Sequence, residues 1–363
     1  MVYGTGFPMN VSVPDEWRTD LNLAPFVTRH LFRPVALLAA EFSLYAGAVA
    51  GAVLLTPLWE KFACAFVAGV LTATMAIIGH DCAHRGGTRY GWLNRLIGTI
   101  GFLPALHPLS RWAYHHNQVH HRFTAQIGID NAYSPMSIDD YRAATPLRRA
   151  YYRFQRSLFG QPFYYLIDIW VADIFFPGAK QRATFTGRDY FDLALVYVWL
   201  VAFLAGLTWL SLHVGGAQSL GAAFANAAIF GLLIPFLVWN LFISFVTVIQ
   251  HTGPDVKWSL PTGRPSTAYQ KLHGTVRIRF PEVVDLLFHR LMQHTAHHLN
   301  PIIPLYSLKA AQHALEEGRG EEVISIRWTP AYHWRLTRDC KLYDPKADRW
   351  CDFDFRPTAP RAA

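Results

Sequence analysis

Four long apolar runs dominate the pattern of hydrophobic and polar positions along this chain. They cover residues 34–57, 62–79, 190–213 and 221–249, and their only charged residues are Glu41 and Asp192. Each run is close to or longer than the ~20 residues that a helix needs to cross ~30 Å of hydrocarbon. Runs this long and this poor in charge are rare in soluble folds, so the pattern predicts four transmembrane helices.

Short connectors predict how these helices pair. Residues 58–61 join the first two runs and residues 214–220 join the last two, which predicts two tight hairpins. Both connectors then lie on one side of the membrane, and all remaining residues lie on the other. The expected organisation is an N-terminal segment 1–33, a first hairpin 34–79, a middle segment 80–189, a second hairpin 190–249 and a C-terminal segment 250–363.

Basic residues assign the two sides. Of the 33 Lys and Arg, only Lys61 lies in a connector, and none lies inside a run. Because positive charge stays in the cytoplasm, we expect both termini and the middle segment to be cytoplasmic, in the inner membrane of a bacterium. The net charge of +8 fits contact with anionic lipid or with an acidic redox partner. Four cysteines without a C-x-x-C pair fit a reducing compartment.

Nine histidines mark the ends of the apolar runs or form short clusters on the expected cytoplasmic side. Imidazole is the usual protein ligand of iron, zinc and copper. In a helix, residues three or four apart share one face, so we expect His80 to pair with His84 and His116 with His120, while His121 points to a second metal. The nine are His80 and His84 in HDCAH, His116, His120 and His121 in HNQVHH, the lone His251, and His294, His297 and His298 in HTAHH.

The number of histidines bears on the number of metals. A single zinc takes about four ligands, whereas two metals with four or five imidazoles each use the whole set. Iron is the redox-active choice for histidine ligands and O2 chemistry, and copper matches the ligand type as well. Candidates to orient these imidazoles are Asp81, Asn117 and Asp130. Isolated histidines are interpreted as capping or hydrogen-bonding residues, and His115 stays ambiguous; the isolated ones are His30, His107, His213, His273, His289, His313 and His333.

At this point the chain resembles a known family. HDCAH, HNQVHH and HTAHH, in this order around two membrane hairpins, are similar to the three histidine boxes of the membrane fatty-acid desaturase superfamily. GHDCAHRG resembles the first box of the omega-6 (delta-12) acyl desaturase branch, and Trp112 with HHNQVHHRFT resembles the context of its second box. The second box here has three residues between its first two histidines, where many omega-6 members have two. The resemblance covers roughly residues 30–310.

The resemblance implies an all-α integral membrane protein with four transmembrane helices and a mostly helical cytoplasmic cap. It implies a non-haem centre of two iron ions bound by the nine histidines, with O2 as co-substrate and a fatty acyl chain as substrate. The reaction it implies is the O2-dependent removal of two hydrogens to form a double bond. Because the sequence shows no G-x-G-x-x-G motif after a strand and no HPGG motif, electrons are expected from an external ferredoxin or cytochrome b5-like protein.

Alternative functions predict different features in the sequence. A membrane di-iron hydroxylase, of the alkane-monooxygenase or carotenoid-oxygenase type, also carries many histidines, but HDCAH and TVIQHTG favour a desaturase. A metal transporter would place its ligands near the bilayer midplane. The basic and aromatic stretch RRAYYRFQRSLFGQPFYYLIDIW is expected to lie at the membrane interface, and its place between membrane spans argues against nucleic-acid binding.

Overall fold

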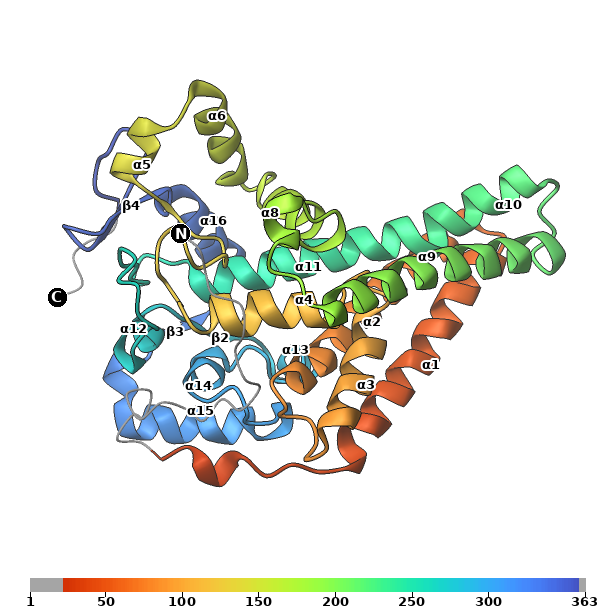
Figure 1. The fold of residues 1–363 in the computed structure, drawn as a ribbon, viewed down its shortest axis with the longest axis horizontal. Coiled ribbons are helices and arrows are strands. Elements are labelled where there is room, and N and C mark those ends of the chain that lie inside the picture. Colours follow the sequence, from red (N-terminus) through yellow and green to blue (C-terminus); the bar gives the residue numbers. More distant parts are fainter. Residues whose placement is uncertain (1–21, 359–363) are drawn as a thin grey trace.

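The computed structural model describes residues 22–358 as long helices that extend from a mostly helical cap (Figure 1). Four helices are long and apolar enough to cross a membrane, and their bounds are α1 Phe32–Leu54, α2 Leu58–Ala83, α9 Gly187–His213 and a continuous span Leu220–His251. The expected class, an all-α membrane protein with four such helices, is confirmed. Residues 1–21 of the expected N-terminal segment lie outside the described residues.

The ends of these helices differ slightly from the predicted ones. The expected connector 58–61 belongs to α2, which begins directly after Pro57, because proline lacks the N–H that a helix interior needs but fits just before its first turn. At its other end α2 continues past the apolar run through His80 to Ala83. The helix therefore carries a histidine rigidly beyond the membrane-spanning part.

The fourth span consists of three helical pieces. They are α10 Leu220–Asn226, the π-helical η5 Ala227–Leu233 and α11 Ile234–His251. Pro235 lies in the first turn of α11, and its missing N–H explains a local departure from the α-helical hydrogen-bond pattern. The piece closest to the cap, α11, ends at His251.

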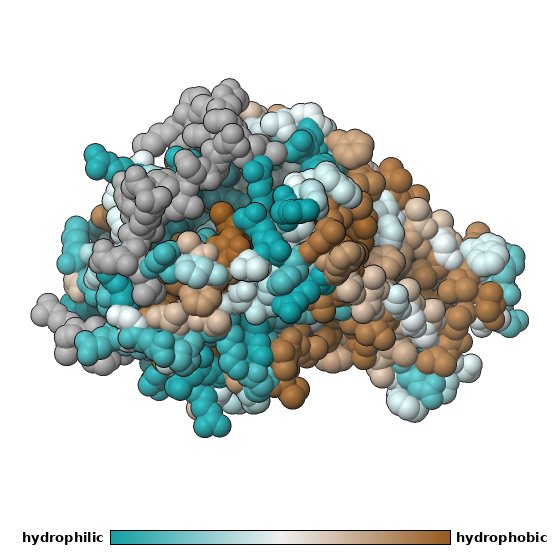
Figure 2. Space-filling model, turned by 90° about the horizontal axis from the view of Figure 1, so that it is seen from below, coloured by the Kyte–Doolittle hydropathy of each residue, from teal (hydrophilic) through white to brown (hydrophobic). Residues whose placement is uncertain are grey.

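Close contacts hold the spans together. The short helix α3, Gly91–Phe102, packs against α2 so tightly that a Cβ atom on Gly101 would lie 2.6 Å from the carbonyl oxygen of Met75. Near the far end of the hairpins, Lys61 Nζ lies 2.5 Å from Asn226 Oδ1, and Asn226 donates to the carbonyl oxygen of Val53 at 2.8 Å. These contacts join the two hairpins. Figure 2 shows the resulting apolar belt over the long helices beside the hydrophilic cap.

The cap consists of short helices and two small sheets. Strand β4 pairs in parallel with β1 and antiparallel with β5, and β2 pairs in parallel with β3. The strands are β1 Met136–Ser137, β2 Arg277–Arg279, β3 Ser325–Arg327, β4 Leu342–Asp344 and β5 Arg349–Cys351. The helices between the spans are α4 Leu109–Ala113, η3 Tyr114–His120, α5 Ile138–Ala143, α6 Pro146–Gln155, α7 Gln161–Phe163, η4 Tyr164–Phe175 and α8 Ala179–Arg182. The remaining helices are η2 Ala24–Phe26, α12 Ala268–His273, α13 Glu282–Leu287, α14 His294–Leu299, α15 Leu305–Arg319, η6 Gly320–Glu322 and α16 Pro330–Asp339.

The C-terminal tail is part of the cap core. Trp350 on β5 is fully buried and donates its indole N–H to the carbonyl oxygen of Val256 at 3.0 Å. The hydroxyl of Tyr152 on α6 donates to the carbonyl oxygen of Lys341 at 2.6 Å, next to β4. The tail thus holds the segment that follows the second histidine cluster against the rest of the cap.

Candidate metal centre

All nine histidines singled out in the sequence meet inside the cap, where they form two groups. Four elements supply them: the end of α2, the π-helical η3, the last residue of α11 and the short helix α14. Within each group the candidate ligand atoms lie within 4.8 Å of one another. The first group is His80, His84, His116, His121 and His297, and the second is His120, His251, His294 and His298.

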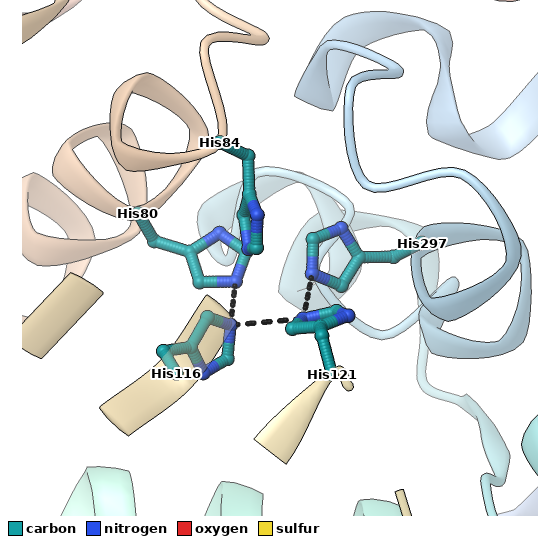
Figure 3. A group of neighbouring side chains, drawn as sticks. All are labelled: His80, His84, His116, His121 and His297. Carbon is teal, nitrogen blue, oxygen red and sulfur yellow. Dashed lines mark hydrogen bonds between the residues drawn. The ribbon is translucent and has the colours of Figure 1, made fainter. Parts of the chain in front are cut away.

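The first group has its side-chain nitrogens turned toward a common point (Figure 3). His116 Nε2 lies 2.9 Å from His80 Nε2 and 3.1 Å from His121 Nε2, and His297 Nε2 lies 3.1 Å from His121 Nε2. The second group is built in the same way, with His251 Nε2 at 2.8 Å from His294 Nε2. The groups adjoin, since the rings of His121 and His298 stack with their centroids 4.1 Å apart.

The pairing within the second cluster differs from the prediction. We expected His116 and His120 on one face and His121 on another, but His116 lies with His121 while His120 belongs to the other group. The reason is that residues 114–120 form a π-helix, in which the N–H of His121 donates to the carbonyl oxygen of His116 at 2.9 Å. A wider turn brings residues i and i+5 together, so the prediction from α-helical spacing was wrong by one residue.

The third cluster contributes to both groups from one helix. On α14, His297 points to the first group while His294 and His298 join the second. Residues three and four apart lie on one side of a helix but not in the same direction, so one turn can serve two neighbouring centres. This helix therefore fixes the two groups relative to each other.

Hydrogen bonds behind the second group fix which nitrogen faces inward. His120 Nδ1 lies 2.8 Å from Asp130 Oδ1, and His251 Nδ1 lies 3.2 Å from the carbonyl oxygen of Gly274. Both partners only accept, so Nδ1 carries the proton and Nε2 is left with its lone pair. His298 Nδ1 lies 3.1 Å from the hydroxyl of Thr124, which itself donates to the carbonyl oxygen of His120 at 2.9 Å. The Nε2 atom of His298 is therefore unprotonated too.

These tautomers fit a bound cation. The Nε2 atoms of His120 and His298 lie 3.1 Å apart, and with both unprotonated, two lone pairs face each other in a buried space. A metal ion between them turns this repulsion into coordination. In the first group, His84 Nε2 is buried without a hydrogen-bond partner among the residues that the structure describes, as a nitrogen reserved for a metal is. The donor set, entirely imidazole, suits iron or copper.

Electrostatics keep the imidazoles in the form that binds metal. Burial is the main cause that lowers the pKa of His84, His116 and His121 well below the usual range, and neighbouring imidazoles lower these pKa values further. The pKa values of His294, His297 and His298 are lowered for the same two reasons. A neutral imidazole retains the lone pair that a protonated one lacks, so the site is prepared for a cation.

The other predicted residues have mixed outcomes. Asp130 orients His120 as expected, whereas Asn117 donates to the carbonyl oxygen of Ala83 at 3.1 Å and so ties η3 to the end of α2. Asp81 accepts a hydrogen bond from the backbone of Leu305 rather than from a ligand imidazole. Sequence reasoning missed the role of Thr124, although this threonine belongs to the second-box context HHNQVHHRFT. The Gly274 carbonyl left no signal in the sequence.

The isolated histidines stay outside both groups. His107 Nδ1 lies 2.6 Å from the carbonyl oxygen of Ala105, and His289 Nε2 lies 2.6 Å from Glu41 Oε1. His115, which the sequence left ambiguous, belongs to neither group and has its Nε2 3.4 Å from a guanidinium nitrogen of Arg111. Clustering in the sequence separated these histidines from eight of the nine candidate ligands, and the ninth, His251, was separated by its place at the end of the fourth apolar run.

A cavity borders both histidine groups. His80 and His116 of the first group and His120, His251 and His294 of the second form part of its wall. Most of the remaining wall is apolar and comes from η4 and α11: Tyr165, Ile169, Ile174, Ile243 and Val246. An apolar chain in this space would lie beside the imidazoles, which is the arrangement needed to act on an unactivated methylene.

Comparison with known proteins agrees with this geometry. The model of the fatty acid desaturase family matches residues 57–330. An sn-1 oleoyl-lipid 12-desaturase of Synechocystis sp. is 30% identical over 282 residues, which cover 74% of this chain and 72% of that protein. A protein of the same name from Picosynechococcus sp. is 28% identical, with 82% and 79% covered. The chloroplastic omega-6 fatty acid desaturase of Arabidopsis thaliana is 27% identical, with 77% and 58% covered.

Four membrane-spanning helices, a histidine-lined centre and an adjoining apolar cavity define a membrane enzyme of lipid metabolism. The chain belongs to the fatty acid desaturase family. The names of its relatives confirm the resemblance to the omega-6 and delta-12 branch. It is therefore an oxidoreductase that acts on fatty acyl chains in a membrane.

Proposed function

We propose that this protein is an O2-dependent di-iron desaturase that introduces a double bond into an acyl chain carried by a membrane lipid. The relatives named sn-1 oleoyl-lipid 12-desaturase support a lipid-borne chain and a bond in the omega-6 or delta-12 region. The observation that carries the proposal is the contact between two all-imidazole groups and one apolar cavity. Neither a zinc site nor a haem site needs nine clustered imidazoles.

The roles of the residues follow from their positions. Two iron ions would supply O2 activation and the capacity to remove two hydrogens from neighbouring methylenes. Asp130, Thr124 and the Gly274 carbonyl hold the second-group imidazoles in the tautomer that binds metal. The first ion would be held by His80, His84, His116, His121 and His297, and the second by His120, His251, His294 and His298.

Positioning is the main contribution of the cavity, because a methylene offers no polar group to recognise. The side chains of Tyr165, Ile169 and Val246 enclose the chain beside the imidazoles. They exclude water from the reacting carbon atoms and fix which methylene faces the metals. The shape of this wall then sets the position of the double bond.

The orientation and the electron donor are part of the same proposal. Because only Lys61 among the 33 basic residues lies in a predicted connector, the metal centre and both termini lie on the cytoplasmic side. Electrons come from a soluble ferredoxin or cytochrome b5-like protein, for which the excess of positive charge favours an acidic partner.

Expression in a host of known lipid composition tests the proposal. We expect new double bonds in lipid-bound fatty acids and about two iron ions per chain. Replacing His121 or His298 by Ala removes one member of one group, and each variant is expected to bind less iron and to form no product. The control is His313→Ala, at an exposed histidine, which is expected to behave as the wild type. An alcohol in place of an alkene would establish a hydroxylase, and full activity of H121A with normal iron would refute the metal assignment.

A further inference from the structure

One lysine is buried directly behind the metal centre without belonging to it. Lys271 lies on α12, is 2% exposed and is not among the candidate ligands. An ammonium group loses its hydration when it is buried, which is costly. The cost is larger beside two groups that are prepared for cations, because like charges repel. A side chain that breaks the rules of stability at such a place points to a function.

The ammonium group of Lys271 contacts the helix that carries the third histidine cluster. Lys271 Nζ donates to the carbonyl oxygen of His298 at 3.2 Å. His298 is the last residue but one of α14, and the final carbonyl groups of a helix have no partner within it. A neutral donor would satisfy the same oxygen, so this hydrogen bond explains the position of the side chain but not its charge.

Lys271 is close to the first group as well as to the second. Burial is the main cause that lowers the pKa of His84 well below its usual range, followed by neighbouring imidazoles, and the charge of Lys271 lowers it further. Such an electrostatic effect falls off with distance. His84 belongs to the first group and His298 to the second, so one ammonium group lies beside both.

The backbone around Lys271 is fixed to the same two elements that carry ligands of the second group. The hydroxyl of Thr275 donates to the carbonyl oxygen of Lys271 at 2.7 Å and lies 3.2 Å from the hydroxyl of Thr295 on α14. The carbonyl oxygen of Gly274 accepts from Nδ1 of His251, the last residue of α11, at 3.2 Å. The ammonium group is therefore held at a fixed place relative to the imidazoles, as a preorganised charge must be.

A fixed positive charge affects the two oxidation states of a metal differently. Lys271 repels a ferric ion more strongly than a ferrous ion, so its charge favours the reduced state. The ligand set acts in the same direction, because neutral imidazoles bring no negative charge to the metals. Burial lowers the pKa of Lys271 to about 8, and the ammonium form still prevails at pH 7.

We propose that the ammonium group of Lys271 raises the reduction potential of the metal centre, so that an external donor reduces it more easily. Lys271 is a positioning residue in this role, since it contacts α14 and does not ligate a metal. The inference rests on the proposed function for the presence of iron. It does not depend on whether the product is an alkene.

Midpoint potentials of the iron bound to the full-length chain test the proposal. Lys271→Met removes the charge at nearly unchanged side-chain length, whereas Lys271→Arg keeps it. Each preparation is titrated with dithionite and redox mediators in detergent and followed by electron paramagnetic resonance. At one fixed potential, we expect about a tenfold lower ratio of ferrous to ferric iron in K271M than in the wild type, which corresponds to about 59 mV. K271R is expected to stay close to the wild type.

The matched control removes a lysine charge at the surface. The side chain of Lys346 is 80% exposed, and water and salt screen its charge, so Lys346→Met is expected to leave the potential unchanged. Lys271→Gln, which keeps an N–H donor without the charge, replaces K271M if that variant does not fold, and a lower potential is again expected.

Three outcomes would overturn the proposal. The first is equal potentials of the wild type and a variant that has lost the charge but binds iron. The second is an equal decrease in K271M and K271R, which would assign the effect to packing around α12. The third is loss of iron from both K271M and K271Q, which would show a purely structural role. Wild-type protein without iron would refute the proposed function together with this inference, whereas an alcohol as product with a lowered potential in K271M would refute desaturation alone.

Discussion

The Nδ1 atom of His120 lies 2.8 Å from Oδ1 of Asp130, and both side chains are buried. The same carboxylate accepts the backbone N–H groups of Ala125 at 2.7 Å and of Ala132 at 2.9 Å. The loop after the second histidine cluster is therefore folded around one carboxylate. Asp130 lies ten residues after His120. The orientation of His120 therefore depends on how the whole loop between these two residues is folded.

Replacing Asp130 by Ala is expected to weaken metal binding without removing a ligand. His120 loses its acceptor and can adopt the other tautomer, and two backbone N–H groups lose theirs. Loss of such an outer partner lowers metal affinity or activity by about 10- to 100-fold. Iron content by mass spectrometry and lipid product analysis measure the effect. D130N, which keeps the volume and an acceptor oxygen, is expected to lose less.

The control for this variant is Asp139→Ala. Asp139 is 75% exposed and lies 3.7 Å from Lys346, and a surface ion pair of this kind contributes little. D139A is expected to retain iron and activity. Equal iron content in D130A and D139A would show that Asp130 does not orient a metal ligand.

The register of the second cluster shows where sequence reasoning stops. Periodicity assigned the membrane spans because lipid imposes a long, charge-free helix on the sequence. It misassigned the partner of His116 because whether a turn is α- or π-helical depends on tertiary contacts, here including the tie from Asn117 to Ala83. The wider turn accommodates the gap of three residues between the first two histidines of HNQVHH.

This account predicts the effect of a deletion. A π-turn is equivalent to one residue inserted into an α-helix, so removing Gln118 would leave His116 and the present His121 four residues apart on one face. We expect the deletion variant to keep most of its bound iron. Inserting one alanine after Val119 would place these two histidines six residues apart and is expected to abolish iron binding.

Iron content and circular dichroism of both variants, compared at equal protein concentration, check this prediction. Complete loss of iron in the deletion variant with its helix content unchanged would contradict the register argument. Equal iron in the insertion variant and the wild type would contradict it as well.

The sequence predicted less of the cap than of the membrane spans. The three clusters identified eight of the nine members of the two groups, since those histidines recur at short intervals, and its place directly after the fourth apolar run identified His251. The cavity wall left no comparable pattern: Tyr165 and Ile169 belong to a stretch that the sequence assigned to the membrane interface. A helix that lines a cavity on one side and exposes apolar side chains on the other is apolar on both sides, so periodicity cannot show which side lines the cavity.

The contact between α2 and α3 predicts a loss of stability. A Cβ atom at position 101 would lie 2.6 Å from the backbone oxygen of Met75 and 3.4 Å from Gly79, so Gly101→Ala forces the two helices apart. Overpacking of this kind costs about 1–3 kcal/mol. Thermal unfolding in detergent is expected to occur at a lower temperature. Gly91→Ala on the same helix has nothing within 4 Å and is expected to be neutral; equal melting temperatures of the two variants would refute the close contact.

Two neighbouring isoleucines on η4 allow the cavity to be tested against the surface of the same helix. Ile169 is 7% exposed and lines the cavity, whereas Ile167 is 40% exposed. Trp at 169 fills space beside the imidazoles and displaces an acyl chain, and a misplacement of about 1 Å can cost up to about 100-fold in rate. Trp at 167 adds apolar surface on the outside.

Lipid product and iron content are measured for both variants. We expect I169W to lose product with normal iron and I167W to resemble the wild type. Equal activity of the two variants would show that the acyl chain does not occupy this cavity.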